Sequence, residues 1–330
     1  MLYLFCLSHQ PSCFIPHHTF SWSTSSQISS FQTIIQETKP TLHDPRDDTT
    51  TRPPPPAAAI IMVLSVLLKF LYPPPPSVVI TAMSVISFVS MSNAGRKETK
   101  GKHMQYSKLR SDTDGDEKKK KEKAKVPSKV GMIVLYTPAF LAGVSSFFIF
   151  PAADFRFNLL RSAVTTHFFK RVFEVLFVHK YSGSMDVEAM ITISLSYFLT
   201  SATMIYNQHL MLPLPEPAID LKYVGIPLFV LGIGGNFYHH YLLSKLRSEG
   251  EKQYKIPQGG LFSLVICPHY LFEILGFFGI SCISQTVYAF SYTLGTTFYL
   301  MGRSYATRKW YESKFEDFPE DVKALIPYIF

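Results

Sequence analysis

The sequence predicts an all-α, polytopic membrane protein in which about seven transmembrane helices enclose a polar cavity. The 330 residues are 47% hydrophobic and 15% aromatic, and only 17% are charged. This composition is too apolar for an ordinary soluble domain. Several apolar segments are near the length of about 20 residues that crosses the hydrocarbon of a bilayer. Four of them nevertheless repeat polar side chains at intervals of three and four, which places those side chains on one helical face.

The expected spans follow one another and leave no room for a separate soluble domain. A shorter apolar stretch, residues 60–72, is expected to lie at the membrane interface. In chain order, the expected spans are 77–93, 130–151, 157–179, 187–211, 220–244, 260–281 and 284–303.

Composition divides the chain into three parts. Residues 1–61 are rich in Ser, Thr, His and Pro and show no periodicity. We expect them to be a disordered extension or a mis-assigned upstream start, because Met62 opens a stretch that reads like a natural protein start. Residues 62–126 contain the first membrane segment and a Lys-rich loop, and residues 127–330 form the membrane domain with the polar stripes.

The positive charge is concentrated outside the expected spans. The formal net charge is +8, and much of the excess lies in a Lys-rich block at residues 118–125. Because apolar spans flank this block, the positive-inside rule predicts a cytosolic loop beside anionic lipid rather than a nucleic-acid site. The same rule places the C-terminus in the cytosol. The expected partner is therefore the lipid bilayer, with no nucleic acid.

Neither the cysteines nor the paired histidines predict a metal site. The four cysteines form no CxxC pair, so neither a disulfide framework nor a structural zinc is expected. His239 and His240 are adjacent and would point to different faces of a helix. No metal is therefore predicted.

The polar stripes carry the functional prediction. An ionisable group at membrane depth costs about 2.5–3.5 kcal/mol even on lenient scales, so several stripes are expected to face one another around a cavity. For Lys170 and Glu174 alone, a simple ion pair with a snorkelling lysine is the alternative. The glycines before Asn236 do not form a dinucleotide fingerprint, because no strand precedes them. The four stripes are His167, Lys170, Arg171 and Glu174; Asn236, His240 and Arg247; His269 or Tyr270 with Glu273; and Arg303, Thr307 and Tyr311.

Particular motifs resemble a known superfamily. The stretch Tyr254-Lys-Ile-Pro-Gln-Gly-Gly-Leu-Phe262, together with Glu273 and the ending Ala324-Leu-Ile-Pro-Tyr-Ile-Phe330, is similar to the C-terminal domain of the steroid 5α-reductases. That region covers about residues 180–330. The segment from His167 to His179 is more similar to the very-long-chain enoyl-CoA reductases of the same superfamily. The resemblance implies a multi-pass, seven-helix fold in the endoplasmic reticulum membrane, NADPH as cofactor, and hydride transfer to a C=C bond conjugated to a carbonyl.

By position, the resemblance also implies roles for individual residues. Glu273 and Asn236 would orient the nicotinamide amide, while basic side chains at the cytosolic mouth would meet the phosphates. The implied cofactor contacts are Asn236, His240, Arg247, Tyr254, Lys255, His269, Glu273, Arg303 and Tyr311.

The implied substrate pocket departs from the steroid reductases. They hold the substrate ketone with a Tyr and a Glu, and Phe168 and Tyr136 occupy the matching positions here. Phe168 cannot donate a proton, whereas the Lys and Tyr of the enoyl-CoA reductases match Lys170 and Tyr270. We therefore expect catalysis by Tyr270 and Lys170 on a lipid enone or enoyl-CoA, with enzymes of lipid elongation as partners. The expected pocket consists of Tyr136, His167, Phe168 and Glu174.

Three alternatives remain open on the sequence. Related helical folds perform S-adenosylmethionine-dependent methyl transfer. The phenylalanine at position 168 also fits a non-catalytic lipid-binding paralogue. A seven-span receptor would not need basic loops that grip phosphate.

Overall fold

The computed structural model describes residue 62 and residues 65–103, 124–246 and 253–330. All of them lie within one compact unit, Ala57–Phe330. The expected extension at residues 1–61, nearly all of the Lys-rich block and Arg247 fall outside the described residues. The short stretch predicted for the membrane interface is helical over residues 65–70.

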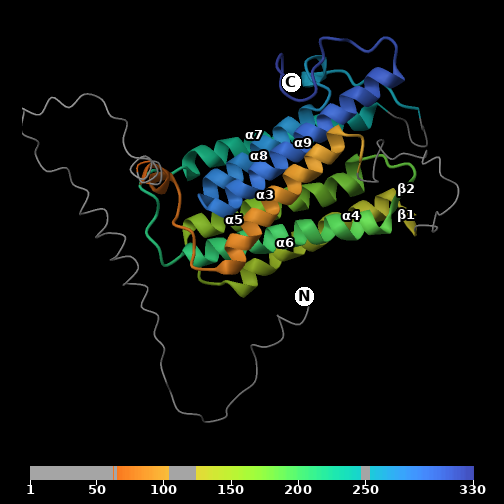
Figure 1. The fold of residues 1–330 in the computed structure, drawn as a ribbon. Helices are drawn as coiled ribbons and strands as arrows, with labels where there is room; N and C mark the ends of the chain where they lie inside the picture. Colours follow the sequence, from red (N-terminus) through yellow and green to blue (C-terminus); the bar gives the residue numbers. More distant parts are fainter. Residues whose placement is uncertain (1–61, 63–64, 104–123, 247–252) are drawn as a thin grey trace, which may run out of the picture. The chain divides into compact units, whose positions relative to one another are not determined.

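Seven long helices occupy the places of the seven expected spans (Figure 1). The helical fold class is therefore confirmed. Two short antiparallel strands, β1 (Lys125–Pro127) and β2 (Ser184–Asp186), were not predicted. The helices are α3 (Val78–Thr99), α4 (Ser128–Ile149), α5 (Phe155–Phe173), α6 (Val187–Met211), α7 (Lys222–Lys245), α8 (Pro268–Ser284) and α9 (Val287–Lys314).

A membrane environment is supported by three of these helices. Within the described ranges, α3, α4 and α6 are long and apolar enough to cross a bilayer. The expected number of seven spans is not confirmed. Large apolar side chains also face outward, and Val78 and Phe148 are 86% and 79% exposed. A soluble protein rarely exposes such surfaces, whereas lipid covers them without cost.

The expected span 260–281 is wrong at its beginning. Residues Gly260–Ser263 form a short 3-10 helix, and α8 begins only at Pro268. Between them the chain pairs with the C-terminal tail: the Ile266 N–H donates to the Lys323 carbonyl at 2.9 Å, and the Lys323 N–H donates to the Leu264 carbonyl at 2.9 Å. Proline suits the first turn of a helix, where its missing N–H leaves no bond unmade.

Small residues bring two pairs of helices into backbone contact. Helix α7 packs along α8, and α3 packs along α9. A Cβ atom at Gly232 would collide with the backbone of Gly276, and one at Gly302 would collide with that of Gly95. Small residues at such crossings are typical of membrane helices, which gain by close van der Waals packing.

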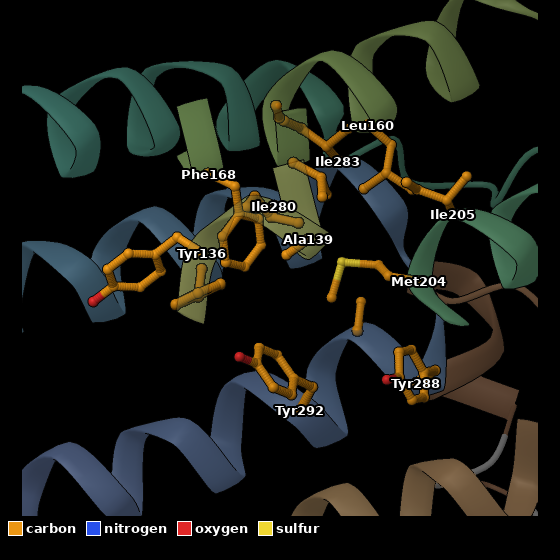
Figure 2. Close-up of a cluster of buried hydrophobic side chains, with 14 of the residues drawn as sticks. Tyr136, Ala139, Leu160, Phe168, Met204, Ile205, Ile280, Ile283, Tyr288 and Tyr292 are labelled. Atoms are coloured by element: carbon orange, nitrogen blue, oxygen red, sulfur yellow. The ribbon is translucent and has the colours of Figure 1, made fainter. Parts of the chain in front are cut away.

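The main apolar core lies where α4, α5, α6, α8 and α9 meet. Figure 2 shows the side chains of Phe168, Met204, Ile280 and Tyr292 directed into this core, while the hydroxyl of Tyr136 points away from its centre. A second apolar cluster joins α8 and α9 to the C-terminal tail. The predicted site residues therefore fall into two groups, one beside the main apolar core and one beside the second apolar cluster.

Candidate active site

One fully buried carboxylate organises the predicted site. Glu174 directly follows α5 and is 0% exposed. Its Oε1 lies 2.9 Å from the Lys170 ammonium and 3.0 Å from Nδ1 of His240. Its Oε2 accepts a hydrogen bond from Arg171 Nη1 at 2.9 Å and lies 3.9 Å from Nε2 of His179. We name the surrounding group the Glu174 cluster; it consists of Tyr136, Lys170, Arg171, Glu174, His179, Asn236, His240 and Glu273.

The local backbone explains how so many groups reach Glu174. Residues Glu174–Val178 form a π turn, in which the His179 N–H donates to the Glu174 carbonyl at 2.7 Å. Such turns insert an extra residue into a helix and occur frequently at functional sites. The expected Lys170–Glu174 ion pair is present, but it is buried and is not a surface pair with a snorkelling lysine.

Three of the four predicted stripes meet at this cluster. The Lys170 ammonium on α5 donates to Oδ1 of Asn236 on α7. The Asn236 amide donates to the His269 carbonyl at 2.7 Å and lies 3.5 Å from Oε2 of Glu273 on α8. The structure therefore brings residues of these three stripes together. The roles of the individual residues remain proposals.

Tyr136 joins the cluster from α4. Its hydroxyl accepts a hydrogen bond from Arg171 Nη2 at 2.5 Å, and the guanidinium lies 4.7 Å from the centroid of its ring. Tyr197 of α6 stacks on the Tyr136 ring at 5.6 Å and also contacts Phe168. Phe168 is 3% exposed within the main core, and the His167 ring packs between Phe168 and Phe277.

The first turn of α8 carries the predicted donor. The ring of Tyr270 lies 4.3 Å from that of His269, whose ring in turn lies 5.3 Å from that of His240. The His269 ring thus contacts the rings of both His240 and Tyr270. His239 turns away, as expected for adjacent histidines: its Nδ1 bonds to the Gly235 carbonyl, and its Nε2 accepts from the Leu261 N–H.

The fourth stripe has different neighbours. Arg303 on α9 donates to Oε1 of Glu98 on α3 at 2.8 Å, and both side chains are 1% exposed. Nδ1 of His103 lies 2.7 Å from the other oxygen of Glu98. Sequence reasoning missed Glu98, because a carboxylate on a distant helix leaves no local spacing signal. Arg303 is therefore already paired within the protein.

The remaining predicted cofactor contacts lie around the C-terminal tail. Tyr311 stacks on Phe315 and Phe318. The Tyr254 ring lies 4.7 Å from that of Trp310, and Lys255 is exposed. The ring contacts of Tyr311 place it in the second apolar cluster, and those of Tyr254 place it beside Trp310, which packs against that cluster.

The charges of the site favour anions over metal ions. The ligand atoms of Glu174, His179 and His240 lie within 4.8 Å of one another, which is a spacing that suits a metal. However, Lys170 and Arg171 already pair with the same carboxylate. Two cations within 3 Å of Glu174 would repel a divalent ion strongly in this buried position. The arrangement suits a group that develops negative charge.

Comparison with known proteins agrees with the predicted resemblance. Residues 185–330 match the family described as 3-oxo-5-alpha-steroid 4-dehydrogenase. The chain is 43% identical to the steroid 5-alpha-reductase DET2 of Gossypium hirsutum over 107 residues, which is 32% of this chain and 42% of that protein. It is 28% identical to the 3-oxo-5-alpha-steroid 4-dehydrogenase 2 of Mus musculus over 211 residues, 62% of this chain and 82% of that protein.

The enoyl-CoA branch is also represented. The very-long-chain enoyl-CoA reductase of Dictyostelium discoideum is 32% identical over 168 residues, 49% of this chain and 55% of that protein. The match to the cotton protein thus spans less than half of that relative's length, and the match to the Dictyostelium protein about half. The predicted resemblance to the superfamily of steroid 5α-reductases and very-long-chain enoyl-CoA reductases is confirmed, and within it residues 185–330 match the 3-oxo-5-alpha-steroid 4-dehydrogenase family.

Proposed function

We propose that this protein is an NADPH-dependent membrane reductase that saturates a C=C bond conjugated to a carbonyl in a lipid, of the 2-enoyl-CoA or 3-oxo-4-ene steroid type. The observation that carries the proposal is the buried Glu174 cluster, to which α4, α5, α7 and α8 each contribute. The named relatives are reductases of these two kinds. We further propose a location in the endoplasmic reticulum membrane, with the Lys-rich loop and the C-terminus in the cytosol.

The free-energy cost of burying the Glu174 cluster supports the proposal that the cluster has a function. Buried ion pairs seldom stabilise a protein more than apolar side chains of the same volume would. Glu174 and Lys170 are 0% and 9% exposed, and two cations compete for one carboxylate. Helix packing alone would be served as well by leucine and phenylalanine. A reaction that develops negative charge gives the two cations beside Glu174 a use.

The residues of the cluster fit a nicotinamide carboxamide. Asn236 and Glu273 present an amide and a carboxylate within 3.5 Å of each other, which together can accept from and donate to such a group. When bound, NADPH would supply the hydride. For the phosphates we propose Arg247, Lys255 and Arg303, the last after exchange of its partner Glu98.

Two tyrosines are available to protonate or hold the substrate carbonyl. Tyr270 is the donor that the resemblance implies, with Lys170 as the cation that would pair with the developing charge. A specific contact also favours Tyr136: because Arg171 donates to its phenolic oxygen, its own proton is directed elsewhere. The adjacent guanidinium would stabilise the phenolate that remains after the proton is transferred. Tyr136 could thus supply the hydroxyl that Phe168 lacks.

The test is NADPH oxidation by the purified full chain in nanodiscs, with a long-chain 2-enoyl-CoA, a 3-oxo-4-ene steroid and a polyprenal offered in parallel. We expect turnover of at least one substrate. Deuterium from labelled NADPH should appear in the product, whereas methyl transfer from S-adenosylmethionine would contradict the reductase assignment. Bound NADPH without turnover of any of the three would favour the non-catalytic alternative.

Tyr270→Phe and Tyr136→Phe then identify the donor. The true donor should lose about 10²–10⁴-fold in kcat with NADPH binding retained. Tyr206→Phe is the matched control, because Tyr206 is 47% exposed on α6. Full activity in both active-site variants would contradict a tyrosine donor.

A further inference from the structure

His239 connects helix α7 to the loop that precedes α8. Its Nδ1 lies 2.7 Å from the carbonyl oxygen of Gly235, one turn earlier on α7, and its Nε2 lies 3.1 Å from the backbone nitrogen of Leu261. A carbonyl can only accept a hydrogen bond, and a backbone N–H can only donate one. The two partners therefore require a neutral imidazole that carries its proton on Nδ1 and accepts at Nε2.

Aromatic rings hold this imidazole in place. The His239 side chain is 3% exposed; Phe272 of α8 stacks on it with ring centroids 5.2 Å apart, and Phe262 meets it edge-on at 5.5 Å. Gly235 makes room for the stack, because a Cβ atom there would lie 2.3 Å from the Phe272 ring. The ring is thus fixed on both faces, with each of its nitrogens in a hydrogen bond.

The bond to Leu261 secures a turn with unusual backbone angles. Gly259 and Gly260 both have positive φ, of 84° and 53°, where a residue with a side chain would be strained. A Cβ atom at Gly260 would also lie 2.7 Å from Nε2 of His239. Glycine at position 260 therefore serves both the turn and the close approach of the imidazole. The Leu261 N–H follows directly, so its bond to His239 holds the turn against α7.

The same loop carries two of the predicted cofactor contacts. Tyr254 and Lys255 lie a few residues before the turn, within the stretch Tyr254–Phe262. On the other side of the turn, the chain has a separate support, because the Ile266 N–H donates to the Lys323 carbonyl at 2.9 Å just before α8 begins. Loss of the His239 bond should therefore disturb the loop more than the first turn of α8.

We propose that His239 is a positioning residue for NADPH: its Nε2 holds the turn at Gly259–Leu261 against α7, and this keeps Tyr254 and Lys255 where they can contact the cofactor. The inference rests on the proposed reductase function. His239 lies outside the Glu174 cluster and acts only through the loop. Without its bond, NADPH would have to order the loop as it binds, and part of the binding free energy would be lost.

The test compares NADPH binding and turnover in the full chain in nanodiscs. His239→Phe keeps a ring between Phe262 and Phe272 and removes both hydrogen bonds. We expect Kd and KM for NADPH to rise about two- to tenfold, as for the loss of one hydrogen bond, with kcat changed less than about twofold. Tyr238→Phe is the matched control: this neighbour is 49% exposed and keeps its ring, so NADPH affinity should be unchanged.

His239→Gln distinguishes positioning from packing. The glutamine amide has an acceptor that can take the place of Nε2, but it has no ring to stack on Phe272. We expect it to recover most of the NADPH affinity that His239→Phe loses, even though its unfolding temperature falls further. If packing alone mattered, the order would be reversed, with the phenylalanine variant closer to the wild type in NADPH affinity.

Gly260→Ala tests the contact from the side of the loop. The added methyl group would collide with Nε2 and should raise the Kd for NADPH. In a His239→Ala background the same change should raise it less, because the group that collides is gone. Strictly additive effects of the two changes would contradict the contact.

Hydrogen exchange gives a readout that needs no cofactor. The Leu261 amide should exchange about two- to tenfold faster in His239→Phe than in the wild type. Unchanged exchange at Leu261, or equal NADPH affinity in the wild type and His239→Phe, would overturn the inference and leave the reductase proposal intact. A wild-type protein that binds no NADPH would instead overturn the reductase proposal, and the inference with it.

Discussion

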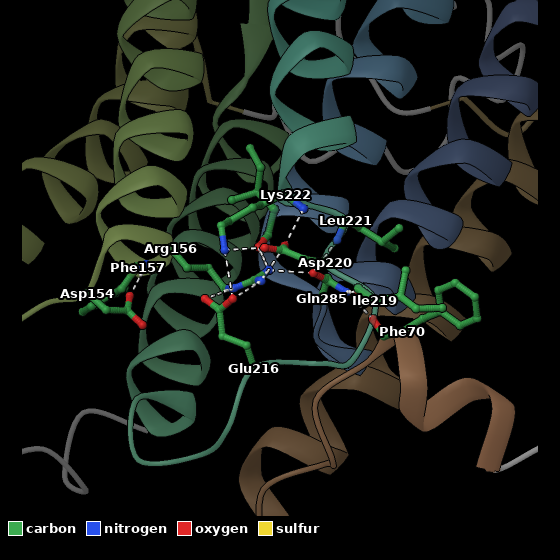
Figure 3. Close-up of polar contacts among 11 residues, drawn as sticks. Phe70, Asp154, Arg156, Phe157, Glu216, Ile219, Asp220, Leu221, Lys222 and Gln285 are labelled. Carbon is green, nitrogen blue, oxygen red and sulfur yellow. Dashed lines mark hydrogen bonds and ion pairs between the residues drawn. The ribbon is translucent and has the colours of Figure 1, made fainter.

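Two buried polar groups in this protein differ in how their cations and carboxylates are paired. The Arg156 cluster, which consists of Arg156, Glu216, Asp220, Lys222 and Gln285, is shown in Figure 3. Arg156 uses all its N–H groups: toward Glu216 and Asp220, and toward the Ile283 carbonyl and Oε1 of Gln285. In the Glu174 cluster, Lys170 and Arg171 compete for one carboxylate.

The difference distinguishes polar groups that stabilise the fold from polar groups that we propose to act in the reaction. Gln285 makes four side-chain bonds, to Arg156, Leu221, Phe70 and Ile219, and so ties four segments together. A network in which every donor and acceptor is satisfied stabilises one arrangement of the chain. In the Glu174 cluster both cations pair with the same carboxylate, so a negative charge on a bound molecule can pair with one of them. We therefore expect changes in the first cluster to affect stability and changes in the second to affect activity.

Arg156→Met should produce the largest effect. The Arg156 side chain is 0% exposed, and breaking a buried pair costs about 3–5 kcal/mol. The lower end of that range applies here, because Glu216 is 44% and Asp220 24% exposed. Thermal unfolding in nanodiscs should show the loss. If Arg156→Met unfolded at the temperature of the wild type, the Arg156 cluster would not be needed for stability, which would contradict this prediction.

Lys170→Met should lower kcat about 10²–10³-fold with little change in unfolding temperature. Removing Lys170 leaves Glu174 paired with Arg171, so the fully buried carboxylate keeps an ion pair. Parallel kinetic and unfolding measurements check both parts. A large loss of stability with unchanged specific activity would show that the cluster is structural.

Glu98→Gln should have an intermediate effect. The buried Arg303 would keep a neutral hydrogen bond and lose its ion pair, at a cost of about 1–3 kcal/mol. If Arg303 binds cofactor phosphate, NADPH affinity should rise several-fold because the competing carboxylate is gone. Isothermal titration measures this, with the surface variant Glu312→Gln as control. Unchanged or weaker binding would remove Arg303 from the phosphate site.

Acid should have the smallest effect, through the Arg156 cluster. Hydrogen bonds from Arg156 and Lys222 lower the pKa of Glu216. The pKa of Asp220 is also lowered, because bonds from Lys222 and Arg156 outweigh the opposing effect of burial. The stability that both contribute is fully present above the unfolded carboxyl pKa of about 4 and is lost as pH falls through the lower folded values.

The pH prediction has a direct control. Unfolding temperatures of the wild type should fall between about pH 4 and pH 2 by more than those of a Glu216→Gln/Asp220→Asn double variant. The difference should be small, because both carboxylates are partly exposed to solvent. Parallel curves for the two proteins would contradict the assignment.

Local spacing explains which parts were predictable. The seven helices and the meeting of Lys170, Glu174 and Asn236 follow from apolar length and from polar residues on one helical face. Glu98 and Gln285 were missed because Arg303, which pairs with Glu98, and the groups bonded by the Gln285 side chain are more than 60 residues away in sequence, and a lone glutamate or glutamine has no periodic signal. The late beginning of α8 depends on pairing with Lys323, which local sequence cannot reveal.

The π turn at Glu174–Val178 means that a single deletion could alter the surroundings of Glu174. Deleting one residue there would restore regular winding and rotate the following chain by about 100° relative to the helix before it. His179 would swing away, while Lys170 and Arg171 would stay in place. A single-codon deletion could therefore change which side chains surround Glu174 without substituting the others.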